Sequence, residues 1–495
     1  MSSPPTRPEA PLVLAPPTFP GLLAAAAELA RLAEQAAGPA DEQPVLSLAV
    51  PLQASHSRTL DPLALLPALG ATDPFRFLWD GAPGLCLAAS GRCHSLQLSG
   101  PRRFELAQRF CSLTLQRLAT SAEPLPPLAR PRVLLAFAFF DTPLEQGRSA
   151  AGVEAVLPRW QLSRQGRHCW LRLQRTLGGT ITPRSVAEEL WEMGRHLEGL
   201  AALEANLRTP PAPQEPIQPG AAFGSTWQEA YRGALQHGLA LVEGGELSKL
   251  VLAARQRVEL GSPLDPRVLL AHLRRSQPGS CRFLWQPTAE EALLGASPER
   301  LLTVRQGVLR SDALAGTRPF GAEAGDLLQS EKDRREHELV VETISHGLRQ
   351  AGLIPHRARP PRLARHGGLV HLHTPITAPL ASQTPLALAE ALHPTPAVAG
   401  LPRREAMTWL RTLEPFERGH YAAPIGWIDS MGDSELRVAI RSGLMRQGSL
   451  ELTAGAGLVR GSVPEREEQE VALKLKVLLD QLLPTATSES SRAIV

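Results

Sequence analysis

Two pairs of acidic residues, far apart in the sequence, have the residue type and spacing that could bind a metal ion. Asp333 and Glu336 form the first pair, and Glu467 and Glu470 form the second. Each pair is spaced i,i+3 in a segment with apolar residues at helical intervals, so its members share one helix face. Two such faces brought together offer up to four carboxylates, which suit Mg2+. The alternative is two solvated helix faces, which an isolated acidic pair favours.

The composition is that of a globular protein from a reducing compartment. The 495 residues are 43% hydrophobic with a net charge of +3, and no basic stripe indicates nucleic acid binding. Most basic residues are Arg, so the few lysines merit individual inspection. Five cysteines without a CxxC pair favour free thiols. Without an apolar stretch near ~20 residues or a signal-peptide pattern, we expect a cytoplasmic protein that contacts neither membrane nor nucleic acid.

A proline-rich segment at 209–220 divides the chain, because proline forbids helix and favours an extended linker. We predict an N-terminal α/β subdomain at 21–208 and a catalytic region at 221–483. The Pro-rich N-terminus at 1–20 is predicted to be disordered, and the tail at 484–495 is predicted to be flexible.

Apolar periodicity predicts many strands with helices grouped between them. Helices are expected at 22–37, 104–119, 183–207, 226–242 and 266–275, and strands at 45–52, 75–79, 133–140, 169–173, 249–254, 282–286, 293–296, 301–305, 308–313, 369–373, 422–428, 436–441 and 450–453. Hairpin-like connections favour an α+β fold whose large, mostly antiparallel sheet forms the core, with helices packed outside. The tetrapeptide Arg-Phe-Leu-Trp occurs at 76–79 and 282–285, which indicates two related subdomains facing one another.

Polar motifs in the C-terminal half fall at the ends of predicted strands, where sites are usually built. GASPE ends one strand at Glu299, LAGTRP ends another at 314–319, and Ile440-Arg441 closes a third. The AGAG motif at 454–457 is predicted to be a turn after a fourth strand, where backbone N–H groups can approach an anion closely.

Ten motifs in order resemble the chorismate-utilising enzymes, which include isochorismate synthase, anthranilate synthase component I, aminodeoxychorismate synthase component I and salicylate synthase. They span about residues 226–482 and read LSKLVLAAR, GASPERL, LAGTRP, EKDRREHELV, HLHTP, PTPAVAGLPR, RGHYAAPIGW, LRVAIRSG, AGAGLV and EEQEVALKLK. The preceding ~220 residues resemble the family only in plan. The resemblance implies chorismate as substrate, Mg2+ as cofactor and the chorismate-binding fold.

The resemblance assigns a general base and a general acid. In the isochorismate synthases a Lys activates water for attack at C2 of chorismate, and a Glu protonates the departing 4-hydroxyl. Lys249 and Glu299 match these residues. Such chemistry requires that the pKa of the lysine be lowered and that of the glutamate be raised. Taken alone, Lys249 would be a strand-edge lysine and Glu299 a turn carboxylate.

The metal ligands follow from the same resemblance. Glu336 and Glu470 match the direct Mg2+ ligands, while Asp333 and Glu467 are expected to reach the ion through water. The C1 carboxylate of chorismate would complete the site, which fixes the ring and draws electron density from the diene.

The remaining matched positions surround the substrate. Arg441 and Tyr421 are expected to hold the enolpyruvyl carboxylate, since Arg offers a bidentate fork. The resemblance also places at the substrate Ala315, Gly316, Thr317, His371, Ala397, Gly455, Gly457 and Lys474. Lys474 could equally form an i,i+4 ion pair with Glu470. We assign His373 no role, because the family has a small residue there.

Three positions distinguish the members of the family. Ammonia-using members carry Gln where this chain has Lys249, and aminodeoxychorismate synthase carries Lys where it has Ala315. Members that eliminate pyruvate carry Thr at the position of Ala397. The resemblance therefore implies an isochorismate synthase, an isomerase that moves a hydroxyl from C4 to C2. No glutamine amidotransferase subunit is then required, and we expect a monomer.

Two alternatives remain open. A salicylate synthase performs the same first step and then eliminates pyruvate, which Ala397 disfavours. A catalytically silent scaffold subunit would keep the fold, although Lys249, Glu299, Glu336 and Glu470 are all present. The sequence leaves the downstream pathway open among menaquinone, phylloquinone, siderophore and salicylate synthesis.

Overall fold

The computed structural model describes residues 18–36, 43–53, 60–70, 72–81, 84–121, 125–143, 150–206, 227–261 and 264–482. The predicted linker at 209–220 and tail at 484–495 lie outside these residues. The predicted N-terminal disordered segment also lies outside them, except for residues 18–20. There the prediction is wrong, since helix α1 begins at Phe19.

The N-terminal half combines seven described strands with helices. In chain order its elements are α1 (Phe19–Ala36), β1 (Val45–Leu52), α2 (Pro62–Leu65), β2 (Arg76–Asp80), β3 (Cys86–Leu98), α3 (Arg103–Gln116), β4 (Leu118–Ala119), β5 (Arg132–Phe137), β6 (Val153–Gln165), β7 (His168–Thr176) and α4 (Pro183–Asn206).

The C-terminal half carries the matched motifs. Its elements are α5 (Trp227–Glu243), β8 (Lys249–Glu259), α6 (Pro266–Ser276), β9 (Cys281–Gln286), β10 (Glu291–Ser297), β11 (Arg300–Arg305), β12 (Val308–Pro319), α7 (Glu331–Gln350), β13 (His356–Arg357), β14 (Arg362–His366), β15 (Leu369–Pro379), α8 (Pro385–Leu392), β16 (Gly400–Leu401), α9 (Arg403–Leu413), β17 (Pro424–Asp429), β18 (Ser434–Val438), β19 (Ser442–Arg446), β20 (Ser449–Leu458) and α10 (Pro464–Leu479).

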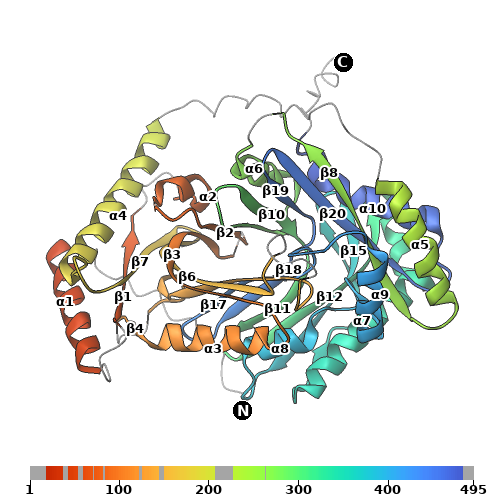
Figure 1. The fold of residues 1–495 in the computed structure, drawn as a ribbon, viewed down its shortest axis with the longest axis horizontal. Helices are drawn as coiled ribbons and strands as arrows, with labels where there is room; N and C mark the ends of the chain where they lie inside the picture. Colours follow the sequence, from red (N-terminus) through yellow and green to blue (C-terminus); the bar gives the residue numbers. More distant parts are fainter. Residues whose placement is uncertain are drawn as a thin grey trace, which may run out of the picture.

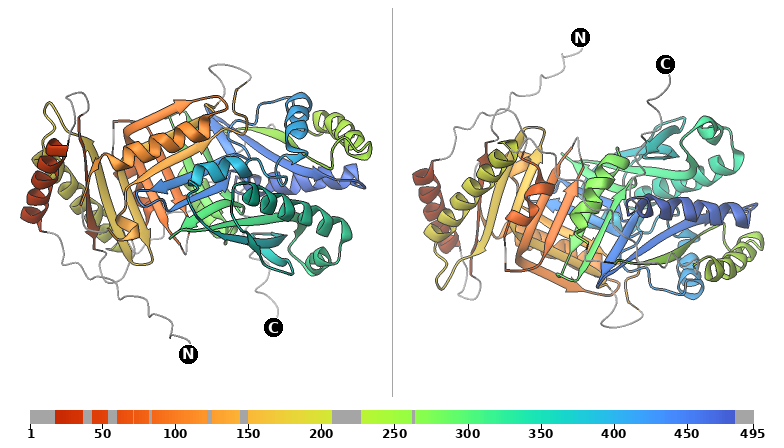
Figure 2. Two further views of the ribbon diagram at one scale, coloured as in Figure 1. Left: turned by 90° about the horizontal axis from the view of Figure 1, so that it is seen from below. Right: turned by 90° about the horizontal axis from the view of Figure 1, so that it is seen from above.

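The strands of both halves form one hydrogen-bonded network, and helices surround it. Among the described strands, every pairing is antiparallel except that of β1 with β4. The halves are joined where β2 pairs with β9 and β5 pairs with β17. Figures 1 and 2 show α1 and α4 at one end of the molecule and α5, α7 and α10 at the other. The predicted α+β fold with a mostly antiparallel core is therefore confirmed.

The two Arg-Phe-Leu-Trp copies lie side by side in the structure. They form β2 and β9, which pair antiparallel with Leu78 opposite Leu284 and Phe77 opposite Trp285. The rings of Phe77 and Trp285 make an edge-to-face contact at 6.0 Å. All four residues are buried, Phe77 and Trp285 in one apolar cluster and Leu78 and Leu284 in another, so the repeat joins the two halves through the core on both faces of the sheet.

Several predicted boundaries are wrong. The helix expected at 104–119 ends at Gln116, and the next residues form β4. LAGTRP lies inside β12, where the register shifts between Ala315 and Arg318, and AGAG lies inside β20. The strand expected to reach Arg441 ends at Val438, and Arg441 adopts a positive φ of 53°. The positions of LAGTRP and AGAG were predicted wrongly because their small residues provide no apolar pattern.

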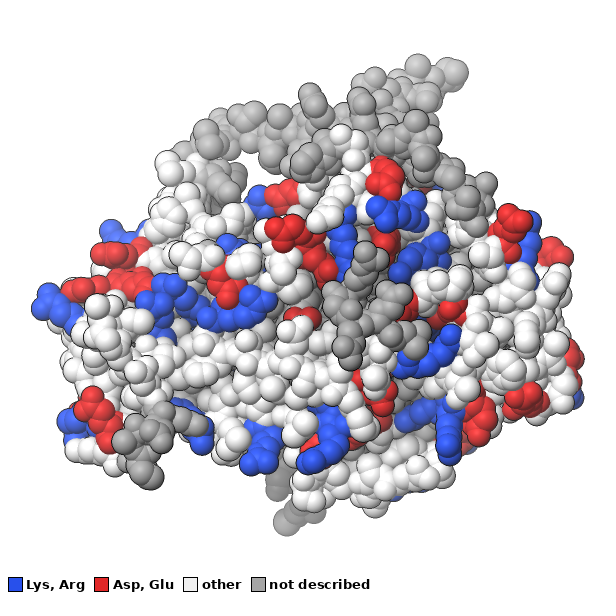
Figure 3. Space-filling view, viewed as in Figure 1, with Lys and Arg blue, Asp and Glu red and all other residues white. Residues whose placement is uncertain are grey.

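Charges of both signs are found on the surface. On the face shown in Figure 3, basic and acidic side chains are interspersed over the described residues. Within the described ranges, no helix is long and apolar enough to cross a membrane. All five cysteines are free thiols.

Candidate active site

Lys249 lies at the start of β8, between β16 and β20. It pairs with Leu401 of β16, and the next residue, Leu250, pairs with Leu458 of β20. Only 1% of Lys249 is exposed, and its Nζ donates to Glu336 Oε1 at 2.8 Å. A lysine buried in a central strand with a carboxylate partner is not the solvated strand-edge residue of the alternative interpretation.

Close packing around position 457 explains why the AGAG segment contains glycine although it forms part of strand β20. A Cβ atom at this position would lie 2.9 Å from Glu336 Oε1 and 3.0 Å from Lys249 Cε. Gly455 lies equally close to the backbone of β8, since its Cβ would lie 2.8 Å from the carbonyl oxygen of Leu252. The glycines thus let the Lys249–Glu336 ion pair lie against β20, and the predicted anion-binding turn does not form.

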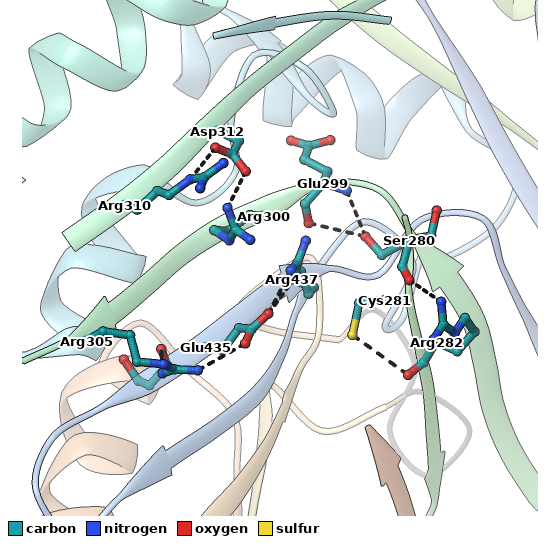
Figure 4. A network of polar contacts seen from close by, with 12 residues as sticks. Ser280, Cys281, Arg282, Glu299, Arg300, Arg305, Arg310, Asp312, Glu435 and Arg437 are labelled. Carbon is teal, nitrogen blue, oxygen red and sulfur yellow. Dashed lines mark hydrogen bonds and ion pairs between the residues drawn. The ribbon is translucent and has the colours of Figure 1, made fainter. Parts of the chain in front are cut away.

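Glu299 is held at the junction of β10 and β11 by its own motif. Its backbone N–H donates to Ser297 Oγ at 3.2 Å, and Ser297 Oγ donates to the carbonyl of Val438 at 2.6 Å. The next residue, Arg300, pairs with Asp312 at 2.6 Å. Figure 4 shows the Glu299 side chain pointing away from Arg300 and from Arg437 of β18. The arginine network therefore anchors the backbone and leaves the Glu299 carboxyl free for other contacts.

The Glu299 carboxyl has the protonation behaviour of a neutral-pH acid. Burial raises its pKa to about 7, although the Thr395 hydroxyl, which donates to Oε1 at 3.4 Å, and the charges of Lys249, Lys474 and Arg441 oppose this rise. A pKa near neutrality suits a group that donates or accepts a proton at physiological pH. The same influences show that Lys249, Lys474 and Arg441 act electrostatically on Glu299.

The four acidic residues of the two pairs lie on helices, as predicted. Asp333 and Glu467 occupy the first turns of α7 and α10, where carboxylates interact favourably with the helix dipole. The N-cap Ser330 accepts from the backbone N–H of Asp333 at 3.3 Å. One turn further, Glu336 and Glu470 lie on the same faces. This position gives Asp333 and Glu467 a helix-stabilising role in addition to any ligand role.

Each of these carboxylates has a basic partner. The distances are 3.1 Å for Asp333 with Arg318, 2.8 Å for Glu336 with Lys249, 2.7 Å for Glu467 with Lys332 and 2.6 Å for Glu470 with Lys474. Across the described part of the chain, no three His, Cys, Asp or Glu side chains are grouped closely enough to hold a metal ion together. The carboxylates are thus engaged in ion pairs.

The two acidic pairs nevertheless meet around one positive charge. Burial alone would lower the pKa of Lys332, but Glu467, Glu336 and Glu470 outweigh burial and raise it. Carboxylates from α7 and α10 therefore act on one ammonium group. The chemistry of this donor set fits a hard divalent cation such as Mg2+, because such ions prefer carboxylate oxygens and these carboxylates of two helices act on the same positive charge.

Arg441 is buried and Tyr421 is half-buried, and both feel the charge of Glu299. Burial lowers the pKa of Arg441, while Tyr421, Glu470 and Glu299 oppose the change. Burial raises the pKa of Tyr421 to about 12, so its hydroxyl is neutral. Arg441 lies in the connection between β18 and β19 and adopts the left-handed conformation there. A buried guanidinium next to a neutral phenol is suited to a carboxylate ligand.

His371 presents one free ring nitrogen. Its Nδ1 lies 3.0 Å from the Gly316 carbonyl and 3.2 Å from Thr317 Oγ1. Its buried Nε2 has no hydrogen-bond partner within the described ranges. Burial and the charge of Arg441 hold the pKa of His371 well below its usual range, so the ring is neutral. With Nδ1 protonated toward the carbonyl, Nε2 can accept a hydrogen bond from a ligand hydroxyl.

A cavity of about 400 Å3 lies beside these residues and is lined by Tyr421, Arg255 and Thr453. Arg255 and Thr453 are paired neighbours on β8 and β20, and they share the sheet face of Lys249 and Gly457. Lys249 and Glu299 do not line this cavity. It therefore lies further along the same sheet face and does not enclose the catalytic pair.

The remaining predicted residues differ in their surroundings. Lys474 Nζ pairs with Glu470 and donates to the Gly455 carbonyl at 2.7 Å. Ala315 is buried in β12, and Ala397 is half-buried and packs against the core. The sequence interpretation missed Thr395, although it lies in the PTPAVAG motif. It also missed Lys332. This lysine lies inside the EKDRREHELV motif, which was interpreted only from its carboxylates.

Comparison with known proteins identifies the family. Residues 34–483 match the family described as "Chorismate binding enzyme". The chain belongs to the chorismate-binding enzyme family. Among its family relatives, the salicylate biosynthesis isochorismate synthase of Pseudomonas aeruginosa is 34% identical over 453 residues, which are 87% of this chain and 90% of that protein. Isochorismate synthase DhbC of Bacillus subtilis is 36% identical over 266 residues, or 51% of this chain and 67% of that one.

Solved structures of chorismate-binding enzymes share the fold. MenF, the menaquinone-specific isochorismate synthase from Escherichia coli, superimposes with a TM-score of 0.70 at 26% identity, covering 92% of this chain and 99% of that chain. Anthranilate synthase component I from Streptococcus pneumoniae superimposes with a TM-score of 0.60 at 18% identity, covering 86% and 95%. The predicted family resemblance is therefore confirmed, and it extends well into the N-terminal half.

Proposed function

We propose that this enzyme is a Mg2+-dependent isochorismate synthase, which converts chorismate to isochorismate by adding water at C2 and losing the 4-hydroxyl. One observation carries the proposal. A fully buried lysine paired with a carboxylate lies in the same site as a buried glutamate whose pKa is about 7. The names of the relatives that match this chain support the same activity.

The two catalytic groups divide the proton transfers. Lys249 accepts a proton from the attacking water, and the resulting ammonium remains beside Glu336, which stabilises the charge. Glu299 donates its proton to the departing 4-hydroxyl and becomes a carboxylate. The charges of Lys249, Lys474 and Arg441 then stabilise that carboxylate. In the reverse reaction the two groups exchange roles.

Substrate carboxylates and the metal define the rest of the site. Arg441 and Tyr421 are proposed to bind the enolpyruvyl carboxylate, with His371 Nε2 accepting a hydrogen bond from a ring hydroxyl. Glu336 and Glu470 would hold Mg2+ directly, and Asp333 and Glu467 through water. When bound, Mg2+ supplies the positive charge that orients the C1 carboxylate of chorismate and draws electron density from the ring.

The same proposal specifies partners and products. Ala397 in place of threonine favours retention of the enolpyruvyl group, so salicylate synthase activity is the less favoured alternative. Lys249 in place of glutamine favours water as nucleophile, so no glutamine amidotransferase subunit is required. We further propose that the enzyme acts as a monomer in the cytoplasm, which the five free thiols support.

A chorismate incubation followed by proton NMR tests the function. With MgCl2 the purified protein should convert chorismate to a mixture with isochorismate, and EDTA should stop the conversion. Release of pyruvate with salicylate would instead identify the lyase alternative. If chorismate stays unchanged with Mg2+, the silent scaffold is the correct interpretation.

A further inference from the structure

Lys332 links the two helices that carry the acidic pairs. It lies in the first turn of α7, and its Nζ donates to Glu467 Oε1 of α10 at 2.7 Å, across 135 residues of sequence. The Glu467 side chain is only 3% exposed, whereas that of Lys332 is 36% exposed. A buried carboxylate thus depends on a half-exposed ammonium for its counter-charge.

The residue type at this position is unusual for the chain. Only four lysines occur in 495 residues, and three of them, Lys249, Lys332 and Lys474, pair with the acidic residues described above. Elsewhere the chain uses arginine almost exclusively. A lysine ammonium is a compact point charge on a flexible stem, whereas a guanidinium binds a carboxylate through a planar, two-pronged contact. A lysine can therefore leave a carboxylate more easily than an arginine can.

Lys332 is also the lysine that can leave most readily. Lys249 is fully buried, and Lys474 is 15% exposed and holds a second partner, the Gly455 carbonyl. Among the described residues, Lys332 has a single hydrogen bond, which it donates to Glu467, and its side chain is 36% exposed. Its charge also acts on Glu336 and Glu470, the two residues proposed as direct metal ligands.

We propose that the Lys332 ammonium is an internal counter-ion that exchanges with the divalent cation. Without a cation it holds Glu467 and neutralises the carboxylates of both helices, and it moves into solvent when the cation binds. This inference rests on the proposed metal site. Its physical basis is that buried carboxylates need a counter-charge, while an ammonium and a divalent cation a few ångströms apart repel strongly. Lys332 is therefore a positioning residue that limits cation affinity.

The test measures cation binding rather than activity. Free Mn2+ is followed by electron paramagnetic resonance at pH 8 without substrate, for wild type and for Lys332→Gln. We expect the Mn2+ Kd of Lys332→Gln to fall by about tenfold or more, because one repulsive charge is removed. Lys476→Gln is the matched control: it removes an exposed lysine of α10 that has no side-chain partner in the described structure, and its Kd should match wild type.

A second measurement uses the wild-type chain and does not depend on how the variant folds. Acetylation of lysines is quantified by mass spectrometry with and without Mn2+, which four lysines make simple to assign. Lys332 should become several-fold more reactive when Mn2+ binds, while Lys476 should not change. An unchanged or weaker Kd in Lys332→Gln, or equal Lys332 labelling with and without bound Mn2+, overturns the exchange. Absence of Mn2+ binding to both proteins instead overturns the proposed metal site itself.

Discussion

The Nζ of Lys249 donates to Oε1 of Glu336 at 2.8 Å, so the proposed base and a proposed metal ligand share one buried ion pair. Acid–base chemistry and cation binding are consequently coupled through a single carboxylate. A change at Glu336 is therefore expected to affect both functions, whereas a change at Glu470 acts on the cation without touching Lys249. This difference separates the two variants in the first prediction.

Replacing either proposed ligand by its amide should abolish Mg2+-dependent turnover. Glu336→Gln and Glu470→Gln keep the side-chain shape but lose the anionic oxygen that Mg2+ prefers. Glu336→Gln should also lower the melting temperature, because Lys249 is left buried without a carboxylate. Turnover is measured over a range of MgCl2 concentrations. Glu338→Gln and Glu468→Gln, neighbouring positions paired with Arg357 and Arg232, are the controls. Near-normal activity at sub-millimolar Mg2+ in either amide variant shows that the ligand assignment is wrong.

The pH dependence follows from the proton shared by the catalytic pair. The reaction in either direction requires one proton on Lys249 and Glu299 together. Lys249 donates a hydrogen bond to Glu336 in their ion pair, and below pH 7 Glu299 is also protonated, because burial raises its pKa to about 7. As pH rises through about 7, Glu299 loses its proton and the singly protonated pair forms.

We therefore expect kcat/KM to increase with pH up to about 7 and then to level off. Initial rates with chorismate and with isochorismate should give profiles of the same shape, because both directions require one proton on the pair, although its place is exchanged. A profile that falls between pH 6 and 8, or that differs between the two directions, contradicts this assignment of the pair.

Ala397→Thr should introduce some release of pyruvate. The position lies near the enolpyruvyl group in the proposed complex, where the threonine hydroxyl of pyruvate-eliminating relatives is expected. A lactate-dehydrogenase-coupled assay detects the pyruvate. Ala397→Val is the matched control, because valine has the shape of threonine without the hydroxyl. Equal pyruvate from the two variants rules out a role for the hydroxyl and counts against the placement of Ala397.

Loss of either catalytic group should slow the chemical step more than substrate binding. Lys249→Ala and Glu299→Ala should each lower kcat by about 100-fold or more, the usual span for a positioned general base or acid. Lys249→Gln should lose water attack but allow added ammonia to react, because ammonia needs no base. Product analysis by liquid chromatography distinguishes the hydroxylated from the aminated ring. Full hydration activity in Lys249→Gln shows that another group is the base.

Local sequence patterns predicted those features that depend on local structure. The i,i+3 spacing placed both acidic pairs on helices correctly, and the apolar strands gave the antiparallel class. The bounds of the thirteen-residue strands β3 and β6 were not predicted, because their small and polar residues provide no long apolar run. Gly455 and Gly457 were interpreted as a turn. Their real constraint, the closeness of β8, Lys249 and Glu336, arises only when distant elements pack.

The basic residues of the site were the hardest to predict. Lys332 and Arg318 neutralise carboxylates that were interpreted from spacing alone, and nothing in their local sequence indicates which carboxylate each contacts. Lys332 reaches Glu467 across 135 residues, so its partner depends on how α7 and α10 pack. Similarly, Thr395 contacts Glu299 only because its loop folds over the strand end.

Incorporation of solvent oxygen tests the central claim most directly. Chorismate is incubated with the purified protein and MgCl2 in water enriched in 18O, and the products are analysed by mass spectrometry at short times. Water activated by Lys249 should place one 18O atom in each isochorismate molecule, on the C2 hydroxyl, without release of pyruvate. Unlabelled isochorismate would contradict water addition, and the absence of any isochorismate would contradict the proposed function.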